Sequence, residues 1–216
     1  MEIKGRDNLN DMKIIEEFEQ TIAEFAGSKY GVLISSCTNA IFLSLLYLKS
    51  INEISENTAF RIPRQTYVSV PMSIINAGFK IKFELVKWSG VYQLKPTRIY
   101  DSAVRFKKGM YISDSLYCVS FQYRKHIPIG RGGMVLTDEE EAYNWLRQAR
   151  HNGKHPGISK WDDEFEIIGW DMYMRPVDAL LGLTLFKKIE NTDIPDCGTY
   201  KDYPDLIKQK VFNEFL

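Results

Sequence analysis

Residues 116–137 constrain the fold of this chain more than any other segment does. They begin with the apolar run 116–121 and end with the apolar run 134–137, and both have the composition of buried strands. Between the runs lie a polar turn that carries Lys125 and a glycine cluster at 130–133. Glycines let the backbone approach a ligand closely, and a lysine held between two buried strands is suited to act as a Schiff-base amine. A solvated surface lysine is the more common alternative.

The composition is that of an ordinary globular protein. The 216 residues are 44% hydrophobic and 26% charged, enough for one substantial domain with or without an appendage. The formal net charge is zero, which gives no reason to expect a nucleic acid or an anionic membrane as a partner. No apolar run has the length of a membrane span, and residues 1–5 lack the apolar core of a signal peptide.

The cysteines and histidines point to neither disulfides nor metal. Three cysteines, odd in number and widely spaced, fit reduced thiols in a cytoplasm. The three histidines show no metal-ligand spacing, so we expect no metal site. Together these features predict a cytoplasmic protein.

Apolar periodicity predicts alternating strands and helices. Helices are expected at 11–26, 40–48, 70–77, 138–150 and 176–189, and strands at 30–34, 60–63, 80–86, 99–101, 116–121 and 134–137. This alternation favours an α/β fold with a mostly parallel sheet flanked by helices. The small polar residues 35–39, between a strand and a helix, would form an anion site at the helix N-terminus. Simple capping of the helix by these hydroxyl groups is the alternative.

Four short segments in order resemble one enzyme family. They are Ser-Cys-Thr-Asn-Ala at 36–40, Pro-Arg-Gln-Thr-Tyr-Val-Ser at 63–69, Tyr-Asp-Ser-Ala at 100–103, and Ser-Phe-x-x-x-Lys followed by Gly-x-Gly-Gly at 120–133. The set resembles the DegT/DnrJ/EryC1/StrS family of sugar aminotransferases, which use pyridoxal 5′-phosphate (PLP) and have the aspartate-aminotransferase-type fold. The resemblance covers residues 11–190, the large PLP-binding domain of that fold.

The resemblance implies a role for six residues. Lys125 would form the Schiff base with PLP and move protons as a general base, and Asp101 would pair with the pyridinium nitrogen. Tyr67 would stack on the ring. The phosphate would be held by Ser120 and Thr38, together with the backbone of Asn39.

The chain departs from the family pattern at several places. Cys37 stands where the family usually has glycine, so it would be strained if the position needs a positive φ. Val104 replaces a Gln or His that contacts the cofactor. In the segment 167–174, which the family lends to the neighbouring subunit's phosphate, Asp171 and Tyr173 replace asparagine and arginine. A carboxylate there would repel a phosphate.

Two longer features of the family have no counterpart here. No room exists before Asp101 for a further strand and helix, so we expect a sheet one strand short. We expect a shortened large domain over 1–190 and a tail over 191–216 in place of the family's small C-terminal domain.

Three functions follow from these observations. The first is a homodimeric aminotransferase with a shared active site, which transfers an amino group from glutamate to a nucleotide-linked keto-sugar. The second is a homologue that keeps the fold and binds PLP or dimerises without catalysis. The third is an α/β binding module whose motif matches are accidental. Lysine at position 125 favours amino transfer, because relatives that dehydrate their substrate carry histidine there.

Overall fold

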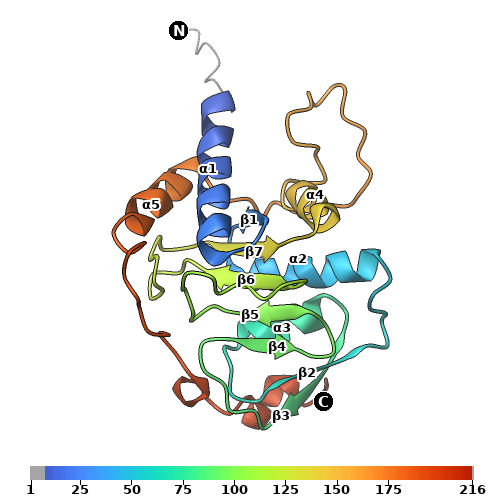
Figure 1. Cartoon of the computed structure of the whole chain (residues 1–216). Coiled ribbons are helices and arrows are strands. Elements are labelled where there is room, and N and C mark those ends of the chain that lie inside the picture. The colour runs from blue at the N-terminus through green and yellow to red at the C-terminus, as the bar shows by residue number, and fades with distance from the viewer. Residues whose placement is uncertain (1–7, 216) are drawn as a thin grey trace, which may run out of the picture.

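The computed structural model describes residues 8–215. The expectation that residues 1–5 are not a signal peptide lies outside this range. In chain order the helices and strands are α1 (Asn8–Ala26), β1 (Tyr30–Ile34), α2 (Cys37–Ser50), β2 (Ala59–Pro63), α3 (Ser69–Asn76), β3 (Lys80–Glu84), β4 (Tyr92–Leu94), β5 (Ile99–Asp101), β6 (Leu116–Ser120), β7 (Gly133–Thr137), α4 (Glu140–Ala149) and α5 (Pro176–Phe186), followed by the short 3₁₀ helices η1 (Tyr200–Asp202), η2 (Leu206–Lys208) and η3 (Lys210–Phe212) (Figure 1).

The α/β class is confirmed, and every expected helix and strand is present with ends that differ by a few residues. One strand was not expected. The segment between β3 and β5 contains β4, which pairs with β5. Three residues are too few for a period-two pattern to be recognised in a sequence.

The main sheet is mixed, with strand order β1-β7-β6-β5-β4, so the expectation of a mostly parallel sheet is wrong. Within this sheet β5 and β6 are parallel, whereas the pairs β1–β7, β6–β7 and β4–β5 are antiparallel. The reason lies in the connections. Residues 121–132 between β6 and β7 contain no helix, and four residues join β4 to β5. A parallel crossover needs a dozen or more residues and usually a helix, so these strands return antiparallel.

The segment β2–α3–β3 forms a separate parallel pair of strands joined by a helix. This pair continues the edge of the main sheet, because Arg61 of β2 forms a bridge with Lys95 after β4 through bonds of 2.7 and 3.2 Å. The two sheets therefore lie side by side in Figure 1.

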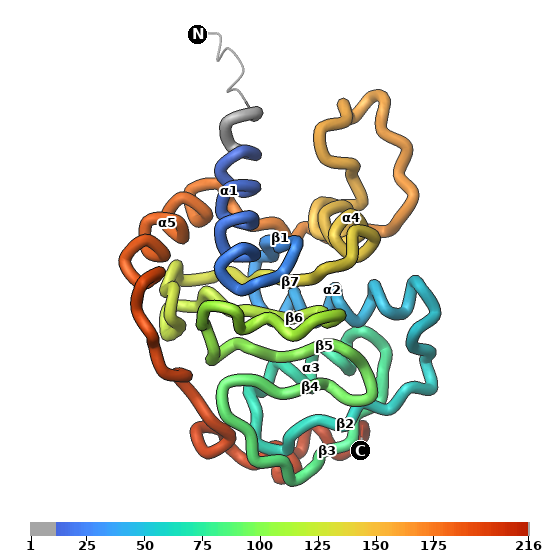
Figure 2. Tube along the Cα trace, in the orientation of Figure 1, coloured from blue at the N-terminus to red at the C-terminus, as the bar shows by residue number. Residues whose placement is uncertain are grey.

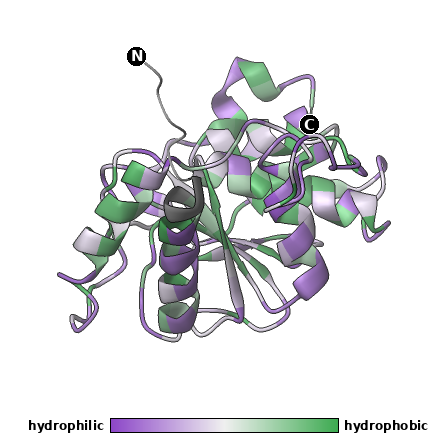
Figure 3. Cartoon of the chain, turned by 90° about the horizontal axis from the view of Figure 1, so that it is seen from above, coloured by the Kyte–Doolittle hydropathy of each residue, from purple (hydrophilic) through white to green (hydrophobic). Residues whose placement is uncertain are grey.

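Two apolar layers enclose the main sheet. Alternate residues of the central strands point to opposite faces, so Val119 of β6 packs with α1 and α5 while Cys118 packs with α2. Helices lie on both sides of the strands when the molecule is seen from above (Figure 3). Burial on both faces explains why β6 and β7 read as continuous apolar runs.

The tail after α5 returns across the molecule. Figure 2 shows it running from α5 to the β2–β3 pair. There Leu206 and Phe212 are buried in the same apolar cluster as α2 and α3, and the Phe212 ring meets the Phe83 ring edge-on at 5.5 Å. The tail is thus packed into the core and not merely laid over the surface.

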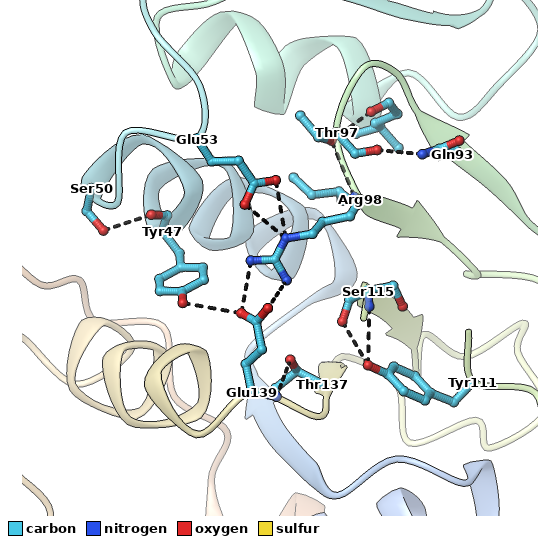
Figure 4. A network of polar contacts seen from close by, with 12 residues as sticks. Tyr47, Ser50, Glu53, Gln93, Thr97, Arg98, Tyr111, Ser115, Thr137 and Glu139 are labelled. Carbon is cyan, nitrogen blue, oxygen red and sulfur yellow. Dashed lines mark hydrogen bonds and ion pairs between the residues drawn. The ribbon is translucent and has the colours of Figure 1, made fainter. Parts of the chain in front are cut away.

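Two arginine networks tie the layers together. Arg98, before β5, donates to both carboxylate oxygens of Glu139 at 2.6 and 2.9 Å and to Glu53 at 3.0 Å (Figure 4). Burial, and then the nearby Glu139, raise the pKa of Tyr47 to about 12. In the second network, Arg150 at the end of α4 pairs with Glu19 of α1, and both side chains are buried.

Candidate functional site

One cavity, about 340 Å³ in volume, lies where several elements end. The parallel strands β5 and β6 finish there with Asp101 and Ser120, and α2 begins beside them. The carboxyl ends of parallel strands are the usual position of a ligand site in an α/β fold. The wall includes five of the six residues singled out from the sequence, namely Thr38, Tyr67, Asp101, Ser120 and Lys125.

Asp101 is a buried carboxylate at the end of β5, with 5% of its surface exposed. One oxygen accepts a hydrogen bond from the Tyr92 hydroxyl at 2.6 Å, and the other accepts from the Ala103 amide at 2.9 Å. Burial raises the pKa of Asp101, while Tyr92, the Ala103 amide and Lys125 act in the opposite direction. The carboxylate is thus placed where its charge is costly, and its donors reduce that cost.

Lys125 lies in the turn after β6, half-buried, on the wall of the same cavity. Its backbone N–H donates to the Gln122 carbonyl at 2.8 Å, which closes the turn. Among residues 8–215 its ammonium group makes no ion pair with a carboxylate. An amine without a salt-bridge partner is available to a ligand.

The N-terminus of α2 borders the cavity. Ser36 caps the helix by accepting from the Asn39 amide at 3.1 Å, as in the capping alternative. Thr38 lines the cavity and donates to Ser69 at 2.8 Å. Asn39 is not part of the wall, and its backbone N–H is occupied by Ser36. The amides of Cys37 and Thr38 have no partner four residues earlier within the helix.

Cys37 is not strained. It is the first residue of α2, and its φ is not positive. The strain expected for a cysteine with a positive φ at this position therefore does not arise. The close approach of β7 is the stricter constraint here. A Cβ on Gly133 would lie 2.4 Å from the Cys37 nitrogen, so only glycine lets the two backbones meet.

Aromatic residues form one side of the cavity. Tyr67 is 58% exposed, and its ring faces the edge of Tyr203 at 6.4 Å. Tyr203 in turn stacks on Trp88 at 5.6 Å, and Trp88 packs on Tyr92 at 4.7 Å. Sequence reasoning missed Trp88, Tyr92 and Tyr203, because they lie on the unexpected strand, next to it, or in the tail.

The remaining wall carries positive charge. Arg124 and Arg131 line the cavity with Lys125, and the Arg131 Nε donates to the Ser35 carbonyl at 3.2 Å. Two of the three are arginines, which suit phosphate and carboxylate groups. Val104, buried at 3% exposure, offers no polar group at the place where the family has Gln or His.

Residues 167–174, the segment that by resemblance would contact the phosphate of a neighbouring subunit, lie against the end of α4. The Trp170 amide donates to the Ala149 carbonyl at 2.6 Å, and Asp171 bridges to His151. The Tyr173 ring meets the His151 ring edge-on at 5.0 Å. Neither Asp171 nor Tyr173 lines the cavity.

No helix between residues 8 and 215 combines the length and apolarity needed to cross a bilayer. Within the same range, no group of three or more His, Cys, Asp or Glu side chains is placed to hold a metal ion.

Comparison with known proteins defines the class of the fold and then the family. The structure matches a solved GDP-4-keto-6-deoxymannose-3-dehydratase with a trapped PLP-glutamate geminal diamine, at a TM-score of 0.67 and 18% identity over 84% of this chain and 64% of that one. The chain thus shares the fold of the PLP-dependent aminotransferases. The model of the DegT/DnrJ/EryC1/StrS aminotransferase family matches residues 2–100 and 108–194, and the chain belongs to this family.

Two curated relatives agree with this assignment. The spore coat polysaccharide biosynthesis protein SpsC of Bacillus subtilis is 24% identical over 82% of this chain, and the GDP-perosamine synthase of Caulobacter vibrioides is 21% identical over 82%. The chain spans 57% of the length of each.

Proposed function

We propose that this chain is a PLP-dependent aminotransferase that transfers an amino group from glutamate to a nucleotide-linked keto-sugar. The observation that carries the proposal is one cavity that brings together the Lys125 amine, the buried Asp101 carboxylate and the N-terminus of α2. An amine, a carboxylate and an anion site are the three groups that a phosphorylated pyridine aldehyde requires.

The donor set of the cavity suits PLP. Asp101 accepts one hydrogen bond at each oxygen, and a carboxylate oxygen can accept a second. It can therefore still accept a hydrogen bond from a protonated ring nitrogen. The first amides of α2, the Thr38 hydroxyl and Ser120 suit a phosphate. The volume is within the range typical of small-molecule sites.

PLP, when bound, supplies an electron sink for the carbanion that forms when the amino-acid substrate loses its α-proton. The residues of the chain do the rest. Asp101 holds the ring nitrogen protonated, and Tyr67 provides an aromatic face beside the ring. Lys125 holds the cofactor and moves the proton between carbon atoms as a general base. Ser120 and Thr38 orient the phosphate.

The substrate class is supported by the relatives and by the charge of the wall. GDP-perosamine synthase is named for a nucleotide-linked amino sugar, and the solved dehydratase was trapped with glutamate. Arg124 and Arg131, at the cavity, suit the carboxylates of glutamate or the phosphates of a nucleotide-sugar. Lysine at position 125 favours amino transfer over the dehydration named for that structure.

We also infer that the chain works as a homodimer in the cytoplasm. The family shares its active sites between subunits, and α5 exposes Val177, Leu180 and Leu181 on one apolar helix. The loop between α4 and α5, which projects in Figure 1, exposes Trp161 and Ile168 at 83% and 81%. Exposed apolar side chains of this size suit a subunit interface.

Absorbance spectroscopy tests the proposal. Purified protein with added PLP should show a visible band that Lys125→Ala abolishes, because Lys125 is the one lysine among residues 8–215 that lines the cavity. Lys108→Ala, at an exposed lysine outside the cavity, is the matched control and should keep the band. A wild-type chain that does not bind PLP would contradict the proposal.

A second measurement separates the catalyst from the accessory homologue. Glutamate added to the PLP-loaded protein should shift the band if the half-reaction occurs. A protein that binds PLP through Lys125 but does not respond to glutamate would be the non-catalytic member. Val104, with no polar group to offer the cofactor, is the observation that favours this second function.

A further inference from the structure

Tyr92 connects β4 to the carboxylate of Asp101. Its hydroxyl donates to the Asp101 Oδ2 atom at 2.6 Å and is also hydrogen-bonded to the Thr66 hydroxyl. Tyr92 and Thr66 are both buried, with 7% and 1% of their surfaces exposed. The three side chains therefore form a chain from the loop after β2, through β4, to the end of β5.

The ring of Tyr92 is fixed independently of this hydrogen bond. It packs against Trp88 with the ring centres 4.7 Å apart, and the Trp88 indole N–H donates to the Gln65 carbonyl at 2.9 Å. Since Gln65 precedes Thr66, the same loop positions both neighbours of Tyr92. Removal of the hydroxyl alone would leave the packing in place.

The surroundings of Asp101 give the hydroxyl a specific task. Lys125 is the cation that faces the carboxylate. The other titratable groups near it, besides Tyr92, are Cys37 of α2, Tyr117 and Cys118 of β6, and Tyr203 of the tail. These four are neutral at pH 7, because burial raises the pKa of each. Besides Lys125, hydrogen bonds from Tyr92 and the Ala103 amide are what stabilise the charged form.

We propose that Tyr92 is a positioning residue for Asp101, which keeps the carboxylate ionised and fixes its orientation toward a pyridine nitrogen. The inference rests on the proposed function for the pyridine ligand. The hydrogen bond between Tyr92 and Asp101 is made by residues of the chain alone. It makes β4, a strand that the sequence did not predict, a part of the cofactor site.

The pH dependence of stability tests the hydrogen bond directly, without cofactor. The free energy of unfolding is measured against pH for the wild type and for Tyr92→Phe, each with and without D101N. In each background, the difference between the protein with Asp101 and its D101N variant isolates the titration of Asp101. The pKa of Asp101 is raised in the folded state. The Asp101 contribution to stability therefore falls as pH rises above the ordinary carboxyl pKa, and it levels off once the pH exceeds the folded-state pKa. Loss of the Tyr92 donor should move that levelling-off point up by roughly one to two pH units.

PLP binding tests the positioning role. Tyr92→Phe should weaken PLP binding about tenfold at neutral pH, because the carboxylate loses the hydrogen bond that fixes its orientation. Thr66→Val, which removes the hydroxyl behind Tyr92, should act in the same direction but less. Tyr117→Phe is the matched control, because Tyr117 is a buried tyrosine on the neighbouring strand that is bonded to Ser102 and not to Asp101. It should change neither readout.

The outcomes are distinguishable. A wild type that fails to bind PLP contradicts the proposed function and the inference with it. A wild type that binds PLP overturns the inference alone if Tyr92→Phe shows the same affinity and the same levelling-off pH. An equal change in Tyr92→Phe and Tyr117→Phe would reduce the effect to a general loss of packing, and would also overturn it.

Discussion

Asp101 occupies a position in which its charge lowers the stability of the folded protein. The sequence identified it through a short motif, and the structure buries it at the end of β5, where its pKa is raised. Its oxygens accept from Tyr92 and from the Ala103 amide, which limits the cost but does not remove it. Functional sites are where such costs are retained.

We therefore expect Asp101→Asn to stabilise the protein without cofactor at neutral pH by about 1 kcal/mol. The amide avoids the burial of a charge and can still bond to the Tyr92 hydroxyl. The sign follows from the raised pKa, since the wild type loses stability as pH rises through the window between the unfolded and folded pKa values of this carboxyl. The gain in stability should therefore vanish in acid. The same substitution should abolish PLP binding.

Thermal unfolding of the apoprotein at several pH values measures this effect. Asp114→Asn is the control, because Asp114 is an exposed residue with a positive φ of 60° that asparagine tolerates equally well. The explanation would be wrong if Asp101→Asn were less stable than the wild type at neutral pH, or if its gain were as large at low pH.

The site residues that could be predicted from the sequence are those that belong to short motifs. Thr38, Tyr67, Asp101, Ser120 and Lys125 could be found because each belongs to a short motif, and the structure brings them to one cavity. Asn39 does not line the cavity, and its amide is used by the Ser36 cap. Tyr92 and Tyr203 belong to no motif, so only the folded chain shows their contribution.

At the scale of elements, the long apolar segments were predictable and the short ones were not. The helices and central strands bury many residues, so their periodicity is strong. Strand β4 is three residues long and gains its partner only when β5 is beside it. Strand direction was missed because it depends on how the chain returns between strands, which composition does not encode.

The tail is an element that the cavity depends on. Its Tyr203 lines the cavity, and Asp205 forms a two-bonded ion pair with Arg64 in the loop before α3. The Leu206 amide donates to the Arg64 carbonyl at 2.8 Å. The ion pair is partly buried, so it should contribute more than an exposed one.

We expect Asp205→Asn to loosen the tail and to weaken PLP binding several-fold, with a loss of about 1–2 kcal/mol in stability. Limited proteolysis should cut the variant first within residues 191–212. Asp178→Asn is the matched control, since Asp178 forms a two-bonded pair with an arginine that is 72% exposed, and neither residue lines the cavity. Equal proteolysis of the two variants would show that the Arg64 pair does not hold the tail.

At the scale of the whole molecule, a buried ion pair joins three elements, α1, β1 and α4. Glu19 of α1 accepts from the Leu33 amide of β1 at 2.7 Å and pairs with Arg150 at the end of α4. Arg150 also donates to the Leu33 carbonyl at 2.7 Å. Both side chains are at most 5% exposed, so neither charge has water as an alternative partner.

Glu19→Gln should therefore cost about 3–5 kcal/mol, because it leaves the buried Arg150 charge without its partner. Glu16→Gln is the matched control, one turn earlier on α1, where a 49% exposed carboxylate also pairs with an arginine of α4. It should cost less than about 1 kcal/mol. Urea unfolding with a common slope measures both values, and similar losses would show that burial does not govern this pair.

The return of the tail has a consequence for synthesis in the cell. Domains fold from the N-terminus as the ribosome releases them, yet Tyr203, Leu206 and Phe212, which complete the wall and the apolar cluster behind it, follow Lys125 in the sequence. A nascent chain that has exposed Lys125 and Asp101 still has an open cavity. Loading with cofactor is thus expected to await release of residues 203–212 from the ribosome. Ribosome-stalled chains that end before or after this segment would reveal the difference.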